Sequence, residues 1–211
     1  MTKFSIMTAL APKTPISDVT KIAEAAESLG LDTLWVYDSW ASKDGYIGLA
    51  LAAQHTKNLL LGIAVAPTPL RHSALLVNTM ATVDDISGGR AILGVGSGGQ
   101  ATCGRLGLPK ARIVEFREEM KLIRHLLDGG KVTVDSQQYE IESVQRPIPL
   151  YTAAWGPRMQ ELSGELADGV IIMGPERAEI INMKAERIRG AAAAAGREPG
   201  SVKIVAQVTC A

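Results

Sequence analysis

The chain has 211 residues, of which 46% are hydrophobic and 21% charged, and its 22 basic and 22 acidic side chains cancel. This composition suffices for one domain with a sizeable core and excludes a disordered chain. The balanced charge argues against nucleic acid or a membrane surface as partner, and no apolar run approaches the roughly 18 residues of a membrane span. Two cysteines, Cys103 and Cys210, match neither a disulfide framework nor a metal-binding spacing, so we expect a cytoplasmic protein without a metal.

Short apolar runs alternate with longer stretches of helical periodicity. The runs are mostly apolar on both faces, as the strands of a parallel sheet covered on both sides require. They span residues 4–10, 33–37, 59–66, 91–95, 150–154, 170–173 and 202–210. The clearest helix is predicted at 17–30, where Ser17 can cap and Gly30 ends the helix. Others are predicted at 73–86, 110–127, 157–166 and 177–195.

This repetition predicts βαβ units, which build either an eight-stranded barrel or an open doubly wound sheet. One region interrupts the alternation: the runs 131–134 and 138–141 flank Asp135-Ser136-Gln137 and predict a surface hairpin. The count is seven strands, so a barrel built from this chain would lack its eighth βα unit. No linker divides the sequence, and we expect residues 1–211 to form a single domain.

A glycine-rich segment, Gly94-Val95-Gly96-Ser97-Gly98-Gly99, follows the fourth predicted strand and contains the spacing GxGxxG. A dinucleotide-binding interpretation needs a helix directly after the glycines, whereas the next convincing helix begins near Lys110. A flexible strand-to-helix loop is one alternative. We favour a loop whose backbone lies close to a flat ligand, because glycine has no side chain that would keep the ligand away.

Other strand ends carry candidate site residues. Asp38 directly follows the second strand, at the end that faces the active site of a barrel, although it could merely cap the next element. Arg71 could pair with a carboxylate or a ligand phosphate, and His72 could order its loop. Gly156-Pro157 opens a helix with free backbone N–H groups, which suit a phosphate. No nucleophile motif or metal set is present, which favours redox chemistry supplied by a cofactor.

Together these segments resemble the luciferase-like monooxygenase superfamily, and within it the deazaflavin (coenzyme F420)-dependent branch typified by methylene-tetrahydromethanopterin reductase. The resemblance extends over essentially the whole chain and rests on residues 34–38, 61–67, 71–72, 86–96, 149–157 and 167–171. It implies an α/β fold of the (β/α)8 TIM-barrel type with a hairpin insertion between strands 4 and 5. With about seven strands, this barrel is expected to be incomplete at its C-terminal end.

The resemblance also implies that a planar cofactor lies across the mouth formed by the carboxyl ends of the strands. Asp38 would be the catalytic residue, in contact with the polar edge of the ring or with the substrate, and a non-proline cis peptide at Ala64–Val65 would support the ring. The glycine-rich loop would run beside the cofactor tail, and the ends of the fifth and sixth strands would hold its phosphate. The implied cofactor-binding residues are Ser39, Ala64, Val65, Ala66, Gly96, Ser97, Gly98, Ala154, Gly156 and Gly174.

The chain departs from the family pattern where many relatives carry a histidine or an acid. Ser39 replaces the histidine, and Met7-Thr8 and Gly99-Gln100 occupy the two acid regions, which leaves Asp38 or a water as the proton source. We expect an oxidoreductase that passes a hydride between coenzyme F420 and a small-molecule substrate. The alternatives are an FMN-dependent monooxygenase and a non-catalytic, cofactor-binding incomplete barrel. Exposed strand edges and an apolar seam predict a homodimer.

Overall fold

Seven parallel strands form one curled sheet in this computed structural model, which describes residues 2–174 and 177–208. Their order across the sheet, β1-β2-β3-β4-β7-β8-β9, follows the chain. This sequential order is that of a barrel, because strand order reverses in a doubly wound sheet. The predicted seven-stranded barrel type is therefore confirmed. The strands are β1 (Ile6–Thr8), β2 (Thr33–Val36), β3 (Leu60–Pro67), β4 (Ala91–Gly96), β7 (Leu150–Ala153), β8 (Gly169–Ile172) and β9 (Lys203–Ala206).

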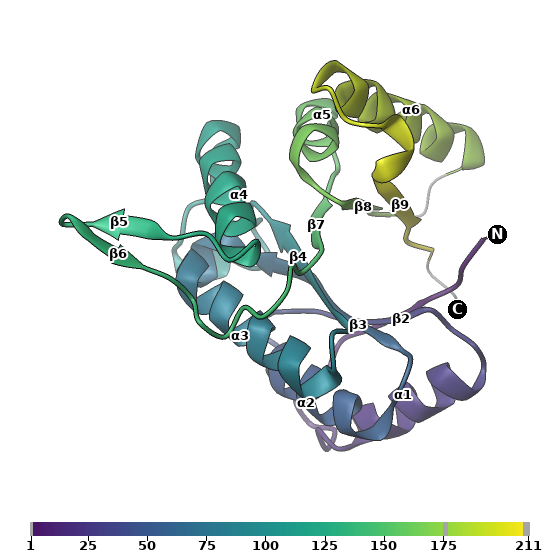
Figure 1. Ribbon diagram of the computed structural model, residues 1–211. Helices are drawn as coiled ribbons and strands as arrows, with labels where there is room; N and C mark the ends of the chain where they lie inside the picture. Colours follow the sequence, from purple (N-terminus) through teal and green to yellow (C-terminus); the bar gives the residue numbers. More distant parts are fainter. Residues whose placement is uncertain (1, 175–176, 209–211) are drawn as a thin grey trace.

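Helices cover the outer face of the sheet. Figure 1 shows α1, α2 and α3 on one side of the molecule and α5 and α6 on the opposite side. The bounds are α1 (Asp18–Ser28), α2 (Gly45–His55), α3 (Ser73–Ser87), α4 (Ile113–Leu127), α5 (Pro157–Leu166) and α6 (Ala178–Ala194). Short 3-10 turns lie at Thr68–Leu70, Gly104–Leu106 and Pro199–Ser201. Because helices pack on one face of the sheet, its other face is left to form the interior of the barrel.

Helix α1 ends as predicted but begins differently. Gly30 has a φ of 72°, a left-handed conformation that favours glycine and terminates the helix. Ser17 occupies the N-cap position, but its side chain makes no capping hydrogen bond, so the predicted cap is wrong. The N–H groups of Asp18 and Val19 donate instead to the carbonyl oxygens of Pro15 and Ile16, both at 3.1 Å. The chain already turns before the helix starts, and this turn satisfies the first amides.

Two large aromatic side chains fill the interior of the barrel. The ring centroids of Trp35 and Tyr151 lie 5.4 Å apart with a 45° angle between the ring planes. Glycines on the neighbouring strands make room for them: a methyl group on Gly62 would lie 2.3 Å from the Trp35 ring, and one on Gly169 would lie 2.3 Å from the Tyr151 ring. The buried interior cluster takes one side chain from each of β2, β3, β4, β7 and β8, namely Trp35, Ala64, Ile92, Tyr151 and Ile171.

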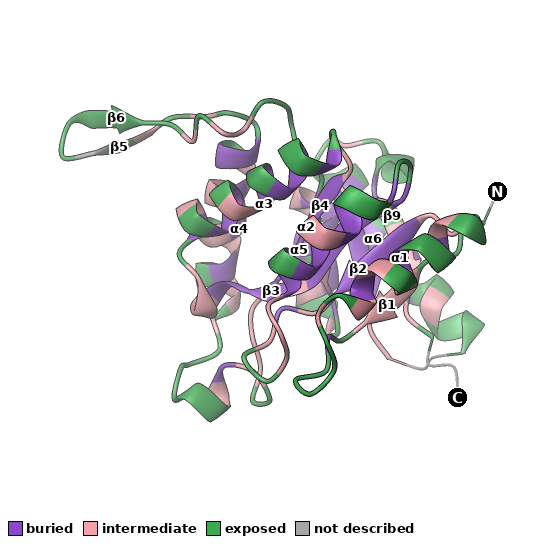
Figure 2. Cartoon of the chain, turned by 90° about the horizontal axis from the view of Figure 1, so that it is seen from below, coloured by how far each residue is buried: buried purple, intermediate pink, exposed green. Residues whose placement is uncertain are grey.

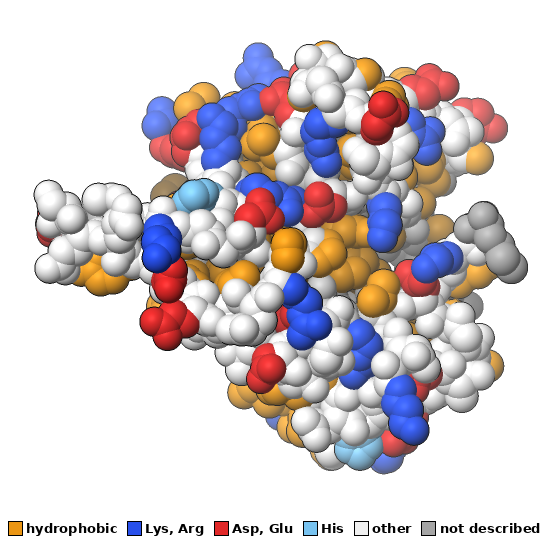
Figure 3. All heavy atoms as spheres, viewed as in Figure 1, with side chains coloured by type: hydrophobic (Ala, Val, Ile, Leu, Met, Phe, Trp, Pro, Cys, Tyr) orange, Lys and Arg blue, Asp and Glu red, His pale blue; other side chains and the backbone are white. Residues whose placement is uncertain are grey.

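Strands β1 and β9 form the two edges of the sheet within the described residues. The sheet curls far enough for Gln207, which follows β9, to donate a hydrogen bond from Nε2 to Tyr37 Oη, which follows β2, at 3.0 Å. Apolar side chains are visible at the surface between the two groups of helices (Figure 3). The seventh predicted run reached residue 210, but the strand ends at Ala206, and residues 209–210 lie outside the described residues.

The predicted hairpin is present as β5 (Val132–Val134) and β6 (Gln137–Tyr139), an antiparallel pair. Asp135 and Ser136 connect the strands with φ values of 49° and 67°, as a two-residue hairpin turn requires. The hairpin lies between the end of α4 and the start of β7, and thus at the amino-terminal edge of the sheet. Figure 2 shows it projecting away from the loops that follow the carboxyl ends of the strands.

The interior packing predicts different effects on stability for two glycine substitutions. Gly62→Ala should lower the free energy of unfolding by about 1–3 kcal/mol, because the new methyl group would overlap the Trp35 ring. Gly190→Ala is the control: nothing lies within 4 Å of its added carbon, and alanine favours the α6 helix, so stability should be unchanged or rise by up to about 1 kcal/mol. Urea unfolding measures both; equal stability of the two variants would contradict this account of the interior.

Candidate active site

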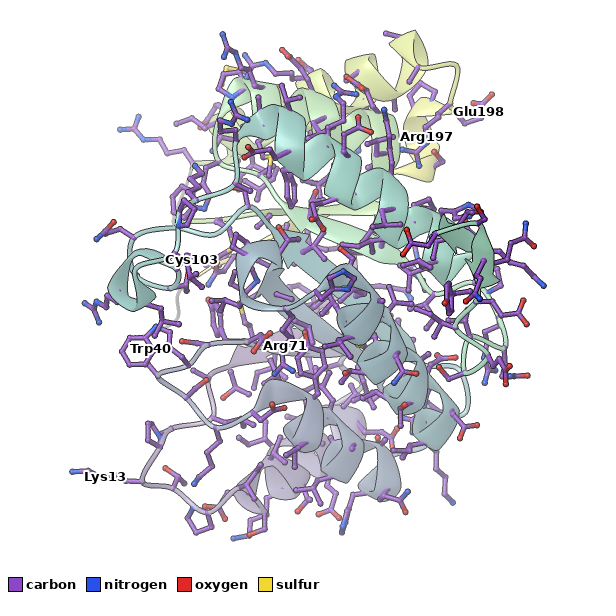
Figure 4. All side chains as sticks on the ribbon, turned by 90° about the vertical axis from the view of Figure 1, so that its left-hand side faces the viewer. Lys13, Trp40, Arg71, Cys103, Arg197 and Glu198 are labelled. Carbon is purple, nitrogen blue, oxygen red and sulfur yellow. The ribbon has the colours of Figure 1, made fainter. Side chains whose placement is uncertain are left out.

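The predicted site residues all follow or end strands of one parallel sheet, and they therefore share its carboxyl edge, here called the mouth. Figure 4 shows Trp40 and Cys103, from the loops after β2 and β4, at one end of the molecule, with Arg71 set further inward. Arg197 and Glu198, which precede β9, lie at the opposite end. The loops after β2 and β4 also touch, because Trp40 Nε1 donates to the Thr102 carbonyl at 3.1 Å.

Asp38 is a buried carboxyl at this mouth, with 8% of its side chain exposed. Its Oδ2 atom accepts a hydrogen bond from the Tyr46 hydroxyl at 3.2 Å and lies 3.3 Å from Arg71 Nε. Burial raises the pKa of Asp38 above its usual value, while the charge of Arg71 and the hydroxyl of Tyr46 act against this rise. The site thus holds an acid whose protonation depends on two neighbours.

Arg71 pairs with carboxylates, which confirms one of its two predicted roles. Its Nη2 atom lies 2.9 Å from Asp44 Oδ2, and its guanidinium carbon lies 4.7 Å from the centroid of the Tyr46 ring. Asp44 is itself held in place, since it caps α2 by accepting the N–H groups of Tyr46 and Ile47 at 2.9 and 3.1 Å. The neighbouring His72 caps α3 by accepting the Ala74 N–H, which agrees with the expected ordering of the loop.

Strand β3 carries the expected irregularity. The Ala64–Val65 peptide bond is cis, and the register between β3 and β4 shifts between Ile63 and Ala66. Two glycines of β4 give this bulge its space. A methyl group on Gly94 would lie 2.2 Å from the Ile63 carbonyl oxygen, and one on Gly96 would lie 2.8 Å from Val65 Cγ2. These glycines are therefore explained by packing against β3, whatever lies above them.

The loop after β4 is long, and α4 begins only at Ile113 rather than near residue 110. With the sequential strand order, this excludes the dinucleotide-binding interpretation of the glycines. Ser97 is half-buried, and its carbonyl accepts the Ala111 N–H at 2.9 Å, which ties the start of the loop to its end. Gly98 has a φ of 79° and packs on the buried thiol of Cys103. Ser39, on the neighbouring loop, accepts the Ala41 N–H in a local turn.

The end of β7 presents a helix start to the mouth. Ala154 is buried, and Gly156 is the N-cap of α5 with no side-chain cap and with Pro157 in the first turn. Nothing lies within 4 Å of a methyl group built on Gly156. Gly174, after β8, has a φ of 102° and lies beneath the ring of Trp155. The space beside the Gly156 Cα at the start of α5 is therefore open.

Several residues of the mouth were not identified from the sequence. Buried Gln160 donates to the Trp155 carbonyl at 2.9 Å and accepts from Arg187 at 2.8 Å, which fixes the backbone before α5. Tyr46 and Asp44 complete the surroundings of Asp38. Asp44 carried a detectable signal, because an aspartate before an apolar run is a common helix cap. Gln160 carried none, since its role follows only from the packing of α5 on α6.

The described part of the chain offers neither a metal-binding cluster nor a membrane-spanning helix. No group of three or more His, Cys, Asp or Glu side chains that could hold a metal ion occurs in residues 2–174 and 177–208. Within the same ranges, no helix has the length and apolarity that crossing a bilayer requires.

The chain belongs to the luciferase-like monooxygenase family, whose model matches residues 1–211. It is 32% identical to a 5,10-methylenetetrahydromethanopterin reductase of Methanolobus tindarius, over 92% of this chain and 61% of the relative. It is 35% identical to an F420-dependent glucose-6-phosphate dehydrogenase of Beutenbergia cavernae, over 73% of this chain and 52% of the relative.

The solved structure of a coenzyme F420-dependent tetrahydromethanopterin reductase from Methanopyrus kandleri superimposes with a TM-score of 0.83 at 27% identity. The match covers 99% of this chain and 65% of the other. This likeness confirms the predicted family and barrel type. The chain spans about three fifths of the length of the reductase relative that it matches.

Proposed function

We propose that this chain binds the deazaflavin coenzyme F420 across the mouth and acts as an oxidoreductase on a small-molecule substrate, in a reaction like that of 5,10-methylenetetrahydromethanopterin reductase. One observation carries the proposal: a buried acid, a bulged strand and an open helix start, which come from β2, β3 and β7, share one edge of the sheet. The names of the relatives at 32% and 35% identity support a deazaflavin over FMN.

The open start of α5 fits the phosphate of such a cofactor. A methyl group built on Gly156 meets nothing within 4 Å, and no side chain caps the helix. The helix dipole favours an anion at this place. Pro157 has the fixed φ that suits the first position of a helix.

The proposed roles of the chain's residues follow from their positions. A bound deazaflavin supplies the carbon that gives or takes a hydride. Ala64 and Val65 would support one face of the ring, while Gly96, Ser97 and Gly98 would let its tail pass close to the backbone. The protein contributes orientation and exclusion of water, which lower the barrier without a protein nucleophile. Asp38 would hold or release a proton beside the reacting atoms.

Two alternatives predict different ligands. The family description motivates an FMN-dependent monooxygenase, which would bind FMN and consume oxygen. Ser39 and Gly99-Gln100, at positions where the family resemblance implies a histidine and an acid, motivate a non-catalytic barrel that binds a cofactor without turnover.

Cofactor titration separates these proposals. We expect F420 to bind with a dissociation constant in the micromolar range or below, measured by its own fluorescence, and FMN to bind at least about tenfold more weakly, a difference of about 1.4 kcal/mol. Binding of FMN alone would support the monooxygenase, and binding of F420 without turnover of any electron acceptor would support the non-catalytic barrel. Binding of neither would overturn the proposal.

A matched pair of variants tests the phosphate position. Gly156→Asp places a negative charge at the start of α5 and should weaken F420 binding about tenfold or more. Gly156→Asn has nearly the same shape without the charge and should change binding much less. Both residues are favoured helix caps, and the site has room for them, so neither should destabilise the fold. Equal effects of the two variants would place the phosphate elsewhere.

We also propose a cytoplasmic homodimer. The edges that β1 and β9 form in the described sheet, and the apolar side chains between the helix groups (Figure 3), support association. Sedimentation equilibrium should give twice the mass of one chain at micromolar concentration. A single-chain mass that persists up to high protein concentration would remove this proposal.

A further inference from the structure

The two carboxyl oxygens of Asp38 have different surroundings. Oδ2 receives both the Tyr46 hydroxyl, at 3.2 Å, and Arg71 Nε, at 3.3 Å. Oδ1 accepts no hydrogen bond from the described residues. The only buried polar side-chain atoms without a partner in that part of the chain are Trp35 Nε1 and Thr68 Oγ1. Since Oδ1 is not among these buried atoms, it is accessible to solvent. The carboxyl group is thus held through Oδ2 and accessible through Oδ1.

We propose that Arg71 and Tyr46 are positioning residues that hold Asp38 by Oδ2 and thereby present Oδ1 at the mouth as the atom that takes up and releases a proton. This inference rests on the proposed function for its purpose, since the reaction needs a proton at the mouth. It adds Tyr46, and a positioning role for Arg71, to the site around Asp38.

The holding groups are themselves anchored by the start of α2. Asp44 accepts two backbone N–H groups of the first turn and so cannot move without uncapping the helix. Arg71 lies 2.9 Å from Asp44, closer than its 3.3 Å to Asp38, and it also stacks over the Tyr46 ring. Tyr46 stands in that same first turn. The guanidinium is thus fixed mainly by α2, and Asp38 is the group it positions.

The groups around Asp38 shift its pKa in different directions. Burial raises the pKa of Asp38, and Arg71 and Tyr46 lower it, whereas the charge of Asp44 raises it. Tyr46 stays protonated, because burial raises the pKa of its hydroxyl well above the ordinary value, and it can therefore always donate. Removing either positioning residue should therefore raise the pKa of Asp38 further and favour the protonated acid.

No other carboxyl stands directly at the ends of the neighbouring strands. Strands β1 and β3 flank β2 in the sheet; β1 ends at Thr8, and β3 ends at Pro67 and is followed by Thr68, and none of these side chains ionises near neutral pH. Asp44 is committed to capping α2 and to Arg71. Among these residues, Asp38 is the group in a position to exchange a proton with a ligand.

Carbon-13 NMR of the protein with labelled aspartate carboxyl groups tests the proposal without any cofactor. Asp38→Asn identifies the signal by its loss. We expect Arg71→Met to move the Asp38 titration midpoint upward by about one pH unit or more, Arg71→Lys to move it less because the charge remains, and Tyr46→Phe to move it upward as well. In the wild type, we expect a single Asp38 signal whose chemical shift moves continuously with pH. Such fast exchange between the protonated and ionised forms requires an oxygen that solvent can reach.

Arg117→Met is the matched control. Arg117 pairs with Glu165 between α4 and α5, and its side chain is 36% exposed against 33% for Arg71. The Arg117→Met substitution should leave the titration midpoint of Asp38 unchanged. If Arg71→Met lowers the melting temperature as Arg117→Met does but leaves the midpoint where it was, the role of Arg71 is merely structural and the proposal fails. If Arg71→Met does not fold, Arg71→Lys and Tyr46→Phe test the proposal instead. An unchanged Asp38 midpoint in both of these variants would overturn the proposal.

A second measurement separates this inference from the proposed function. If F420 binds, the pH profile of hydride transfer should shift upward in Arg71→Met in step with the NMR midpoint. A shifted NMR midpoint in a protein that binds no F420 supports the positioning of Asp38 and overturns the deazaflavin proposal. Turnover of F420 by a protein whose Asp38 midpoint is unchanged in Arg71→Met supports the deazaflavin proposal and overturns the positioning of Asp38.

Discussion

The packing of Trp35 against Tyr151 inside the curled sheet is the contact on which the rest of the structure depends. The two rings come from β2 and β7, which are not neighbours in the sheet, and they fill the interior where Gly62 and Gly169 leave space. This filling supports the curvature of the sheet. The curvature in turn brings the ends of β2 and β9 within hydrogen-bonding distance through Tyr37 and Gln207. Without it, the strand ends would form a row rather than a mouth.

The mouth is built more from backbone than from side chains. Gly94 and Gly96 accommodate the bulge of β3, Gly156 leaves the start of α5 open, and Gln160 fixes the carbonyl before it. Such a surface can lie close to a large flat ligand but has little chemistry of its own. The exception is Asp38 with its cationic and phenolic neighbours. A site of this kind suits an enzyme in which a cofactor supplies the redox chemistry and the protein supplies binding and orientation.

The sequence predicted the strands well because parallel strands covered on both faces must be largely apolar, as residues 34–36 and 91–96 are. Helix α2 was not delimited, because Gly45–His55 is apolar around most of its circumference and lacks the periodicity of a surface helix. The cis bond at Ala64–Val65 followed only from family resemblance. The partners of Arg71 could not be chosen from the sequence, since Asp44 is 27 residues away and only the fold brings them together.

The hairpin of β5 and β6 leaves the body at the edge of the sheet remote from the mouth, and its turn at Asp135 and Ser136 points into solvent (Figure 2). The hairpin turn is therefore a suitable attachment site on the protein. A fluorophore, an affinity peptide or a surface tether attached at the turn would leave the opening to the barrel facing the bulk solution, with the path for ligands unobstructed.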